Sequence, residues 1–307
     1  MRYFLTRLAA AIPTLCIIIT AAFFLMRAAP GGPFDQDQPF SPEIMANLQN
    51  AYGLDQPVFK QYLNYMAALA RGDFGPSFKY KDFSVTDLIA QGFPVTLELG
   101  VAALLLALLV GVPLGVFAAL HHNAPFDYAS MTLAVLGIAI PAFVVLPFLD
   151  LVFGIWLHWL PVAGWESGSL RHLVLPVIAL ALPPLAYVAR LTRGSLLEVM
   201  RSPFIRTAAA KGLPLKIIVL RHALRPALMP VASYLVPAVA ATMTGSLVVE
   251  SIAGLPGIGR YLVQGALNRD YTLVLGMVIV YSALLIGMGL LVDLLYAWLD
   301  PRTRSMA

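Results

Sequence analysis

Charged residues and cysteine are both scarce in this sequence. Charged residues make up 12% of the 307 residues and hydrophobic residues make up 60%, whereas a soluble domain has roughly 25% charged and about 45–50% apolar residues. This composition excludes an ordinary soluble domain and predicts a membrane protein with several spans. There is one cysteine, Cys16, so an intrachain disulfide is excluded.

The residue patterns of common catalytic and metal sites are also missing. The five histidines are not at metal-ligand spacing with one another, with cysteine or with a carboxylate, and no HExxH or GxSxG motif occurs. The glycines of residues 254–259 resemble a phosphate-binding loop, but no Gly-Lys pair occurs in the chain. We therefore expect neither catalysis nor a metal site here, and we interpret the glycine run as a tight re-entrant or interfacial turn.

Six apolar segments are each close to the roughly 20 residues that span a bilayer. The first is longer than the apolar part of a typical signal peptide, so we interpret it as a retained helix. The fourth is the shortest, and Pro176, Pro183 and Pro184 predict that it is kinked and the most broken. The charge-free cores of the segments are Leu8–Met26, Leu99–Leu120, Tyr128–Leu149, His172–Ala189, Pro226–Val249 and Tyr271–Val292.

The basic residues set the expected orientation. With the N-terminus inside, 12 of the 20 lysines and arginines fall in cytoplasmic segments, with 2 at the N-terminus, 8 after the fourth apolar segment and 2 at the C-terminus. The positive-inside rule then predicts that both termini are cytoplasmic. The net charge of +4 therefore reflects topology and does not indicate nucleic-acid binding.

Four carboxylates lie within or beside the apolar segments. Glu98, Asp150 and Glu250 are near the predicted outer ends, and Asp293 is near an inner end. Ionisable groups within membrane spans are candidates for function, but groups at helix ends can reach water, so we favour interfacial carboxylates. No ionisable residue lies in the middle of a segment. This disfavours a proton-coupled mechanism and favours energy from a docked ATPase.

The longest expected external loop covers residues 28–93. Residues 41–53 and 55–72 each begin with helix-starting residues and end at a glycine, which predicts two short helices. The second carries apolar residues at helical spacing. We favour packing of this stripe on the protein's own outer surface, with a platform for an external partner as the alternative. The stripe consists of Val58, Tyr62, Tyr65 and Leu69.

The most informative segment is the basic loop at about residues 190–225. It carries eight lysines or arginines against one acid, Glu198. Ser202 is a suitable N-cap, Pro203 suits a first helical turn and Gly212 suits a helix end, so a short helix is predicted between them. A capped helix in a cytoplasmic loop is suited to docking on a soluble partner. Charge alone would indicate only a solvated loop that sets topology.

Several motifs together resemble one family of membrane proteins. The run 204–213 (FIRTAAAKGL), followed by 222–227 (HALRPA), is similar to the coupling region of ABC importer permeases of the peptide and nickel branch. Residues 78–84 and 265–271 look most like the B-type oligopeptide permease subunit. The resemblance covers the whole chain and includes residues 27–31, 72–77, 93–97, 140–143, 254–259 and 293–302.

The coupling segment departs from the general pattern of this family, which is Glu-Ala-Ala, three residues and then Gly. The chain keeps Gly212, and it has Ala208 at the second alanine position. Arg206 stands in place of the glutamate and Thr207 in place of the first alanine. A salt bridge from that glutamate is therefore not expected here.

The resemblance implies an all-α integral membrane fold of the type I ABC importer permease kind. It implies six transmembrane helices, a short cytoplasmic coupling helix and a long first periplasmic loop, in a multi-pass protein of the bacterial inner membrane. We expect three parts: residues 1–27 as an N-terminal transmembrane helix, residues 28–93 as a periplasmic loop with short helices, and residues 94–307 as a five-helix core.

The resemblance also implies the partners and the site. The function would be import of oligopeptides delivered by a periplasmic binding protein, together with a homologous permease and two cytoplasmic ATPase subunits that hold ATP and Mg. Membrane lipid surrounds the chain, which would bind no nucleic acid and hold no cofactor. The expected ATPase-coupling residues are Glu198, Arg201, Ser202, Pro203, Phe204, Arg206, Thr207, Ala208, Lys211 and Gly212. The candidates for the pathway or the periplasmic gate are Glu98, Asp150, Glu250, Gly254, Pro256 and Gly257.

Within the coupling helix, Phe204 and Ala208 are four residues apart and are expected on one face. We expect Phe204 to be the anchor in the ATPase, with Arg206 or Lys211 at the rim. The alternatives are a permease for dipeptides, nickel or another small solute, and a secondary transporter that works without ATP. A non-transporting membrane scaffold ranks last.

Overall fold

The computed structural model describes residues 2–28, 53–80, 82–166 and 169–299. In these ranges the chain is helical, with one isolated bridge between Pro76 and Ser84 and no strand. Five helices are long and apolar enough to cross a membrane, and the spans number six if one bent pair counts as a single span. The predicted all-α membrane fold is therefore confirmed.

The long helices are α1 (Arg2–Ala28), α4 (Val85–Leu120), α7 (Arg171–Met200), α11 (Met229–Ala253) and α13 (Tyr271–Leu299). The bent pair consists of α5 (Pro125–Ala139) and α6 (Ala142–Leu149), which continues as the π-helix η1 (Asp150–Trp156). The shorter elements are α3 (Val58–Leu69), α8 (Pro203–Ala210), α9 (Leu215–Ile217), the π-helix η2 (Ile218–Ala223), α10 (Leu224–Ala227) and α12 (Ile258–Leu267).

The third apolar segment is broken, whereas the sequence predicted one continuous span from 128 to 149. The two helical parts meet at an angle of 105°. Ile140, between them, is extended with φ −94° and ψ 120°. The following Pro141 explains this, because the proline ring clashes with a helical conformation of the residue before it.

The fourth segment is continuous, so the prediction that it is the most broken is wrong. Helix α7 runs through Pro176, Pro183 and Pro184 without interruption. Each proline removes a backbone donor, but neighbouring helices can hold such a helix together. Pro176 and Pro184 are buried, and α5, α6 and α11 all pack against α7.

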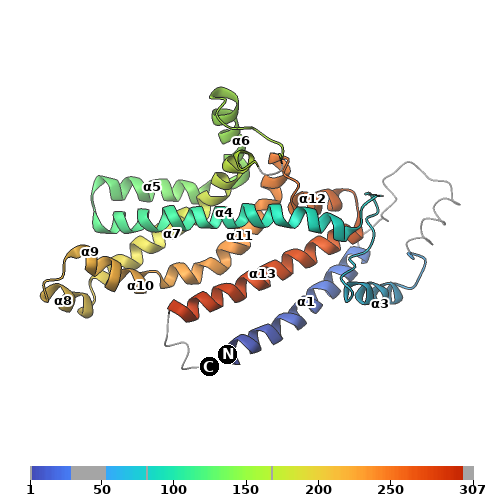
Figure 1. The fold of residues 1–307 in the computed structure, drawn as a ribbon, viewed down its shortest axis with the longest axis horizontal. Coiled ribbons are helices and arrows are strands. Elements are labelled where there is room, and N and C mark those ends of the chain that lie inside the picture. The colour runs from blue at the N-terminus through green and yellow to red at the C-terminus, as the bar shows by residue number, and fades with distance from the viewer. Residues whose placement is uncertain (1, 29–52, 81, 167–168, 300–307) are drawn as a thin grey trace. The chain divides into compact units, whose positions relative to one another are not determined.

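The chain forms two compact units. The first contains residues 1–9, 97–255 and 285–307, and the second contains residues 10–96 and 256–284. In the first unit α7 is the central helix, with α5 and α11 beside it (Figure 1). The elements α8, α9 and η2 follow α7 in the chain and gather near its C-terminal end (Figure 1).

Two glycines on α4 permit a close approach to α7. A Cβ atom added to Gly111 would lie 2.8 Å from the carbonyl oxygen of Leu185. A Cβ atom added to Gly115 would clash with the carbonyl oxygen of Ala189 and lie 2.7 Å from Thr192 Cβ. Small residues four positions apart are the usual means of close helix packing in membranes. The α4–α7 contact therefore depends on these two glycines.

Gly115→Ala is expected to destabilise the protein by about 1–3 kcal/mol, because overpacking forces the two helices apart. The measurement is thermal unfolding of the purified chain in detergent. The matched control is Gly194→Ala within α7, where an added Cβ atom would meet nothing within 4 Å. That change should stabilise the helix by about 0.5–1 kcal/mol. Equal unfolding temperatures for the two variants would contradict the close α4–α7 contact.

In the second unit, the apolar stripe of α3 packs on α1 through its two tyrosines. The hydroxyl groups of Thr20 and Tyr62 are 2.8 Å apart, and the Phe23 ring lies 5.3 Å from that of Tyr62 and 5.9 Å from that of Tyr65. Burial raises the pKa of the Tyr65 phenol above its usual range. The stripe thus covers the protein's own surface, as favoured from the sequence, although Val58 stays 43% exposed.

The two predicted loop helices have different outcomes. The second is observed as α3, and Gly72 beyond its end has a left-handed φ of +81° that favours glycine. The first, predicted over residues 41–53, falls almost entirely outside the described residues.

Asp270 connects the start of α13 to the loop before α4 through hydrogen bonds. Its side chain is fully buried. The Oδ2 atom accepts hydrogen bonds from Ser77 Oγ at 2.5 Å and from the Phe78 backbone N–H at 3.0 Å. The Oδ1 atom accepts from the Leu273 N–H at 3.1 Å, as a helix N-cap does. Sequence reasoning missed this contact, because Ser77 and Asp270 are 193 residues apart.

Asp270→Asn is expected to destabilise the second unit by about 1–3 kcal/mol, because the new amide cannot accept at both of its ends and a buried donor is left unsatisfied. Ser77→Ala removes only one donor and should cost about 0.5–1.5 kcal/mol. Thermal unfolding of the two variants in detergent gives this order. A variant Asp270→Asn as stable as the parent chain would show that the contact is not structural.

Candidate coupling site

The short helix predicted in the basic loop is present as α8. Ser202 occupies its N-cap position with extended backbone (φ −69°, ψ 153°), and Pro203 is the first helical residue. The helix ends at Ala210. Gly212 has a φ of +79° and donates its N–H to the Ala209 carbonyl oxygen at 2.9 Å. Both predicted boundaries of the helix therefore agree with the structure.

The capping bond itself differs from the prediction. The Ser202 side chain makes no hydrogen bond to the N-terminal N–H groups of α8, and its buried Oγ atom has no hydrogen-bond partner among the described residues. The first turn instead uses the backbone, since Arg206 donates its N–H to the Ser202 carbonyl oxygen at 3.2 Å. Ser202 therefore starts the helix through its backbone conformation and not through its hydroxyl group.

Helix α8 has a buried face and an exposed face. Ile205 is 4% exposed and Ala208 is 8% exposed, whereas Phe204 is 50% exposed. The expectation that Phe204 and Ala208 share one face is therefore wrong: Ala208 follows Ile205 into the protein. Phe204 lies on the outer side, where Arg206, Thr207 and Lys211 are also exposed.

The buried face of α8 belongs to one apolar cluster. Ile205 and Ala208 pack with buried side chains from the neighbouring α7, η2 and α10 and from α4, which is distant in the sequence. The cluster is filled by alanine, leucine and isoleucine side chains. Close packing of these side chains holds α8 in a fixed position. The other buried members are Ala119 of α4, Leu196 of α7, Ile218 and Ala223 of η2, and Ala227 of α10.

The two charged candidates before α8 lie at the end of α7. Glu198 and Arg201 are both exposed. They are connected through the backbone, since the Arg201 N–H donates to the Glu198 carbonyl oxygen at 3.1 Å. Their side chains are therefore accessible next to the exposed face of α8.

An ion pair that sequence reasoning missed joins α5 to α7 near this site. Arg193 forms a two-pronged contact with Asp127, from Nη2 to Oδ2 at 2.6 Å and from Nε to Oδ1. Asp127 is 1% exposed and the Arg193 side chain is 23% exposed. His122 Nδ1 lies 3.3 Å from Asp127 Oδ2 and 3.1 Å from Arg193 Nη2.

This cluster fixes the first turn of α5 next to the last turns of α7. The Asn123 N–H also donates to Asp127 Oδ2 at 3.0 Å. Paired fork-shaped contacts of this kind are strong and directional. The end of α7 that leads into α8 is therefore held by an ion pair as well as by the apolar cluster.

The three outer carboxylates proposed from the sequence differ in exposure. Glu98 is exposed, and its interfacial position stays a prediction. Asp150 is 7% exposed and Glu250 is 0% exposed, so the prediction that these two are interfacial is wrong. The reason for Asp150 is the break in the third segment, which places it at the start of η1 instead of at the end of a straight span.

The glycine-rich run is a turn between α11 and α12. Gly254 ends α11 with a left-handed φ of +67°, and the Leu255 N–H donates to the Glu250 carbonyl oxygen at 3.0 Å. Pro256 and Gly257 lead into α12, whose first N–H, from Ile258, donates to Thr96 Oγ1 at 3.0 Å. The tight turn is confirmed, and its re-entrant or interfacial position stays a prediction.

Comparison with known proteins identifies the family. Residues 111–305 match the model of the family described as binding-protein-dependent transport system inner membrane component, and residues 1–100 match that of its N-terminal region. The chain belongs to this family. It is 54% identical over 304 residues to the oligopeptide transport system permease protein OppB of Escherichia coli, with 99% of both chains covered.

Two further permeases cover a similar share of the chain. OppB of Haemophilus influenzae is 50% identical, with 99% of each chain covered. The dipeptide transport system permease protein DppB of Bacillus subtilis is 46% identical, with 99% of this chain and 98% of the relative covered. The protein is thus a multi-pass permease of an ABC importer, and α8 is the short helix that follows its fourth apolar segment.

Proposed function

We propose that this permease forms half of the translocation pathway of an ATP-driven importer for oligopeptides. The observation that supports this most is the 54% identity to OppB over 99% of the chain. The structure adds a short helix that is anchored by one face and exposed on the other. Phe204 is an exposed aromatic residue on a helix whose other face is packed in the protein, and this is the arrangement expected of an interface anchor.

In this proposal the chain itself binds no nucleotide. Two cytoplasmic ATPase subunits hold ATP and Mg, and a groove on one of them receives α8. A homologous permease supplies the other half of the pathway, and a periplasmic binding protein delivers the peptide. Closure of the ATPases moves α8 as a lever, and the pathway changes from inward-facing to outward-facing.

The orientation in this proposal has both termini in the cytoplasm of a bacterium whose inner membrane contains the protein. The excess of basic residues around α8 supports it. Within the site, Phe204 is the anchor. Arg206 and Lys211 are at the rim of the interface with the ATPase. Glu198 and Arg201, at the end of α7, lie next to this interface. The pathway residues Glu98, Asp150, Glu250, Gly254, Pro256 and Gly257 remain candidates.

Purification of the chain from its native membrane in mild detergent, with mass spectrometry of the proteins that accompany it, tests the assembly. We expect one further six-helix permease and ATPase subunits. Recovery of the chain alone, under conditions in which other membrane complexes stay intact, would favour a transporter that works without ATP.

A second candidate is import of dipeptides. The 46% identity to DppB of B. subtilis over nearly the full length supports it. Uptake of one labelled pentapeptide, measured with excess unlabelled dipeptide or unlabelled pentapeptide, separates the two. Uptake of the labelled pentapeptide that excess dipeptide leaves unchanged supports the oligopeptide assignment, and no uptake of the labelled pentapeptide together with uptake of a labelled dipeptide reverses it.

A further inference from the structure

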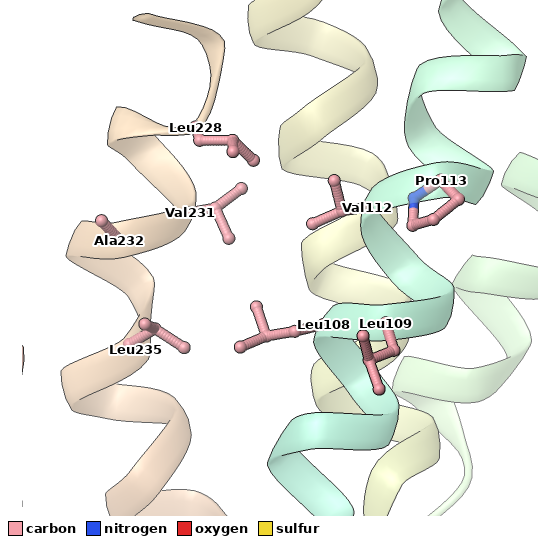
Figure 2. Close-up of a pocket in the computed structure, with 8 residues that line it drawn as sticks. All are labelled: Leu108, Leu109, Val112, Pro113, Leu228, Val231, Ala232 and Leu235. Carbon is pink, nitrogen blue, oxygen red and sulfur yellow. The ribbon is translucent and has the colours of Figure 1, made fainter. Parts of the chain in front are cut away.

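An apolar groove of about 400 Å³ lies between α4 and α11. Its walls are formed by eight apolar residues, four from α4, three from the start of α11 and Leu228 at the junction of α10 and α11. Figure 2 shows Leu108 and Val112 facing Leu228 and Val231 across the groove. The complete lining is Leu108, Leu109, Val112, Pro113, Leu228, Val231, Ala232 and Leu235.

The groove is within membrane-spanning helices, since α4 and α11 are both long and apolar enough to cross a bilayer. Leu109 on its rim is 72% exposed, whereas Val231 and Ala232 on its wall are 3% and 4% exposed. The groove thus has a buried wall and an open rim. Its apolar lining provides no partner for the backbone polar groups of a peptide, which would be costly to bury there.

Basic side chains lie at one end of this groove. Arg225 is three residues before Leu228, which lines the groove, and in helical structure this spacing places the two on one face. Arg221 is four residues earlier, in the π-helix η2, and both arginines are exposed. The end of α4 meets the same region, because Ala119 packs in one cluster with Ala223 and Ala227. The groove therefore opens toward a positively charged end.

We propose that the groove holds one acyl chain of an anionic phospholipid whose phosphate group binds Arg221 and Arg225. An acyl chain in a bilayer is already in an apolar surrounding, so the groove alone gives it little reason to leave the bulk lipid. The charge at the end of the groove supplies the preference, since basic pockets between membrane helices bind anionic headgroups.

A helix from a second copy of the chain fits this groove less well. The positive-inside rule gives both copies the same orientation. The second copy would then bring its own basic residues to the same end, where like charges repel. An anionic headgroup has the opposite charge, and this difference decides between the two occupants.

Native mass spectrometry of the full chain in detergent, titrated with a defined lipid, tests the proposal. The two probes are phosphatidylglycerol and phosphatidylethanolamine with identical acyl chains. We expect one molecule of phosphatidylglycerol to bind at least about tenfold more tightly than phosphatidylethanolamine, because both lipids carry the phosphate but the ethanolamine ammonium group of the second lipid repels the two arginines. The preference should shrink at high salt.

Variants separate the contribution of the apolar groove from that of the two arginines. Ala232→Phe fills the groove and should remove the bound lipid, and Leu109→Gln on the exposed rim should weaken it without the risk of a misfolded core. Arg221→Gln combined with Arg225→Gln should abolish the preference for phosphatidylglycerol. The controls are Val236→Phe, an exposed position next to the groove lining, and Lys216→Gln, an exposed position on α9. Both controls should bind lipid as the parent chain does.

Two results would overturn the proposal. One is equal binding of the two lipids together with unchanged binding by the Leu109→Gln and Ala232→Phe variants. The other is a second copy of the chain in place of the lipid, lost when the groove is filled by Ala232→Phe. The test does not use transport activity, so it stands apart from the proposed peptide import.

Discussion

An aspartate in place of Phe204 is expected to separate ATP hydrolysis from uptake while the chain remains in the membrane in normal amount. The side chain is 50% exposed, so its loss costs the isolated chain little. As an aromatic interface anchor it should contribute at least about 2 kcal/mol, which corresponds to roughly 30-fold weaker ATPase binding. The measurements are co-purification of the ATPase and peptide uptake.

Two neighbouring variants serve as controls for Phe204→Asp. Ile205→Asp places a charge in the apolar cluster and should reduce the amount of folded chain, because Ile205 is 4% exposed. Leu267→Asp changes an exposed leucine at the end of α12, away from the coupling segment in the sequence, and should leave ATPase binding intact. Normal uptake by a correctly inserted Phe204→Asp variant would exclude Phe204 as the anchor.

Removing the Asp127 carboxylate is expected to have the second large effect. Asp127→Ala leaves Arg193 without its ionic partner in a mostly buried position. Loss of one member of a buried pair costs about 3–5 kcal/mol, and the low end applies because 23% of the Arg193 side chain is exposed. Thermal unfolding in detergent should show the loss, and uptake should fall because the end of α7 that carries α8 is released.

A double-mutant cycle separates the pair from its two members. Asp127→Ala together with Arg193→Ala removes both members, and the alanines form no new hydrogen bond. Its destabilisation should be smaller than the sum of the single changes by about 1 kcal/mol or more, as for residues in direct contact. Additive effects would show that the two residues act independently and that the contact does not hold α5 to α7.

Local signals in the sequence were sufficient for the coupling helix. Ser202, Pro203 and Gly212 act within their own turns, so both ends of α8 agree with the structure to within a residue. The faces of the helix were not predictable in the same way. Ile205 and Ala208 turn inward because a cluster is offered there by the neighbouring α7, η2 and α10 together with Ala119 of α4, and α4 is distant in the sequence.

Pro141 is a signal for the break in the third span, but the continuous apolar composition of the segment favoured a single span. Pro141 restricts Ile140, and this restriction produces the 105° bend. The three prolines of α7 carried the same signal, yet that helix is continuous because it is packed on several sides. A proline therefore indicates where a span can break, and the surrounding helices decide whether it does.

The charged contacts of the fold were beyond sequence reasoning. Arg193 meets Asp127 across 66 residues, and Ser77 meets Asp270 across 193. Neither pair has a spacing that a helix or turn would bring together. Glu250 was predicted to reach water from a helix end, but the turn at Gly254 lies just beyond it and the side chain is fully buried.

Uptake of a labelled oligopeptide into proteoliposomes containing this permease, its partner permease and the ATPases is the measurement that decides whether the chain works by ATP-driven peptide import. The binding protein and peptide are added outside and ATP is enclosed. We expect accumulation that requires enclosed ATP and is lost with Phe204→Asp. Accumulation of the same peptide without ATP, driven by an ion gradient and unaffected by Phe204→Asp, would contradict both the proposed energy source and the role of α8.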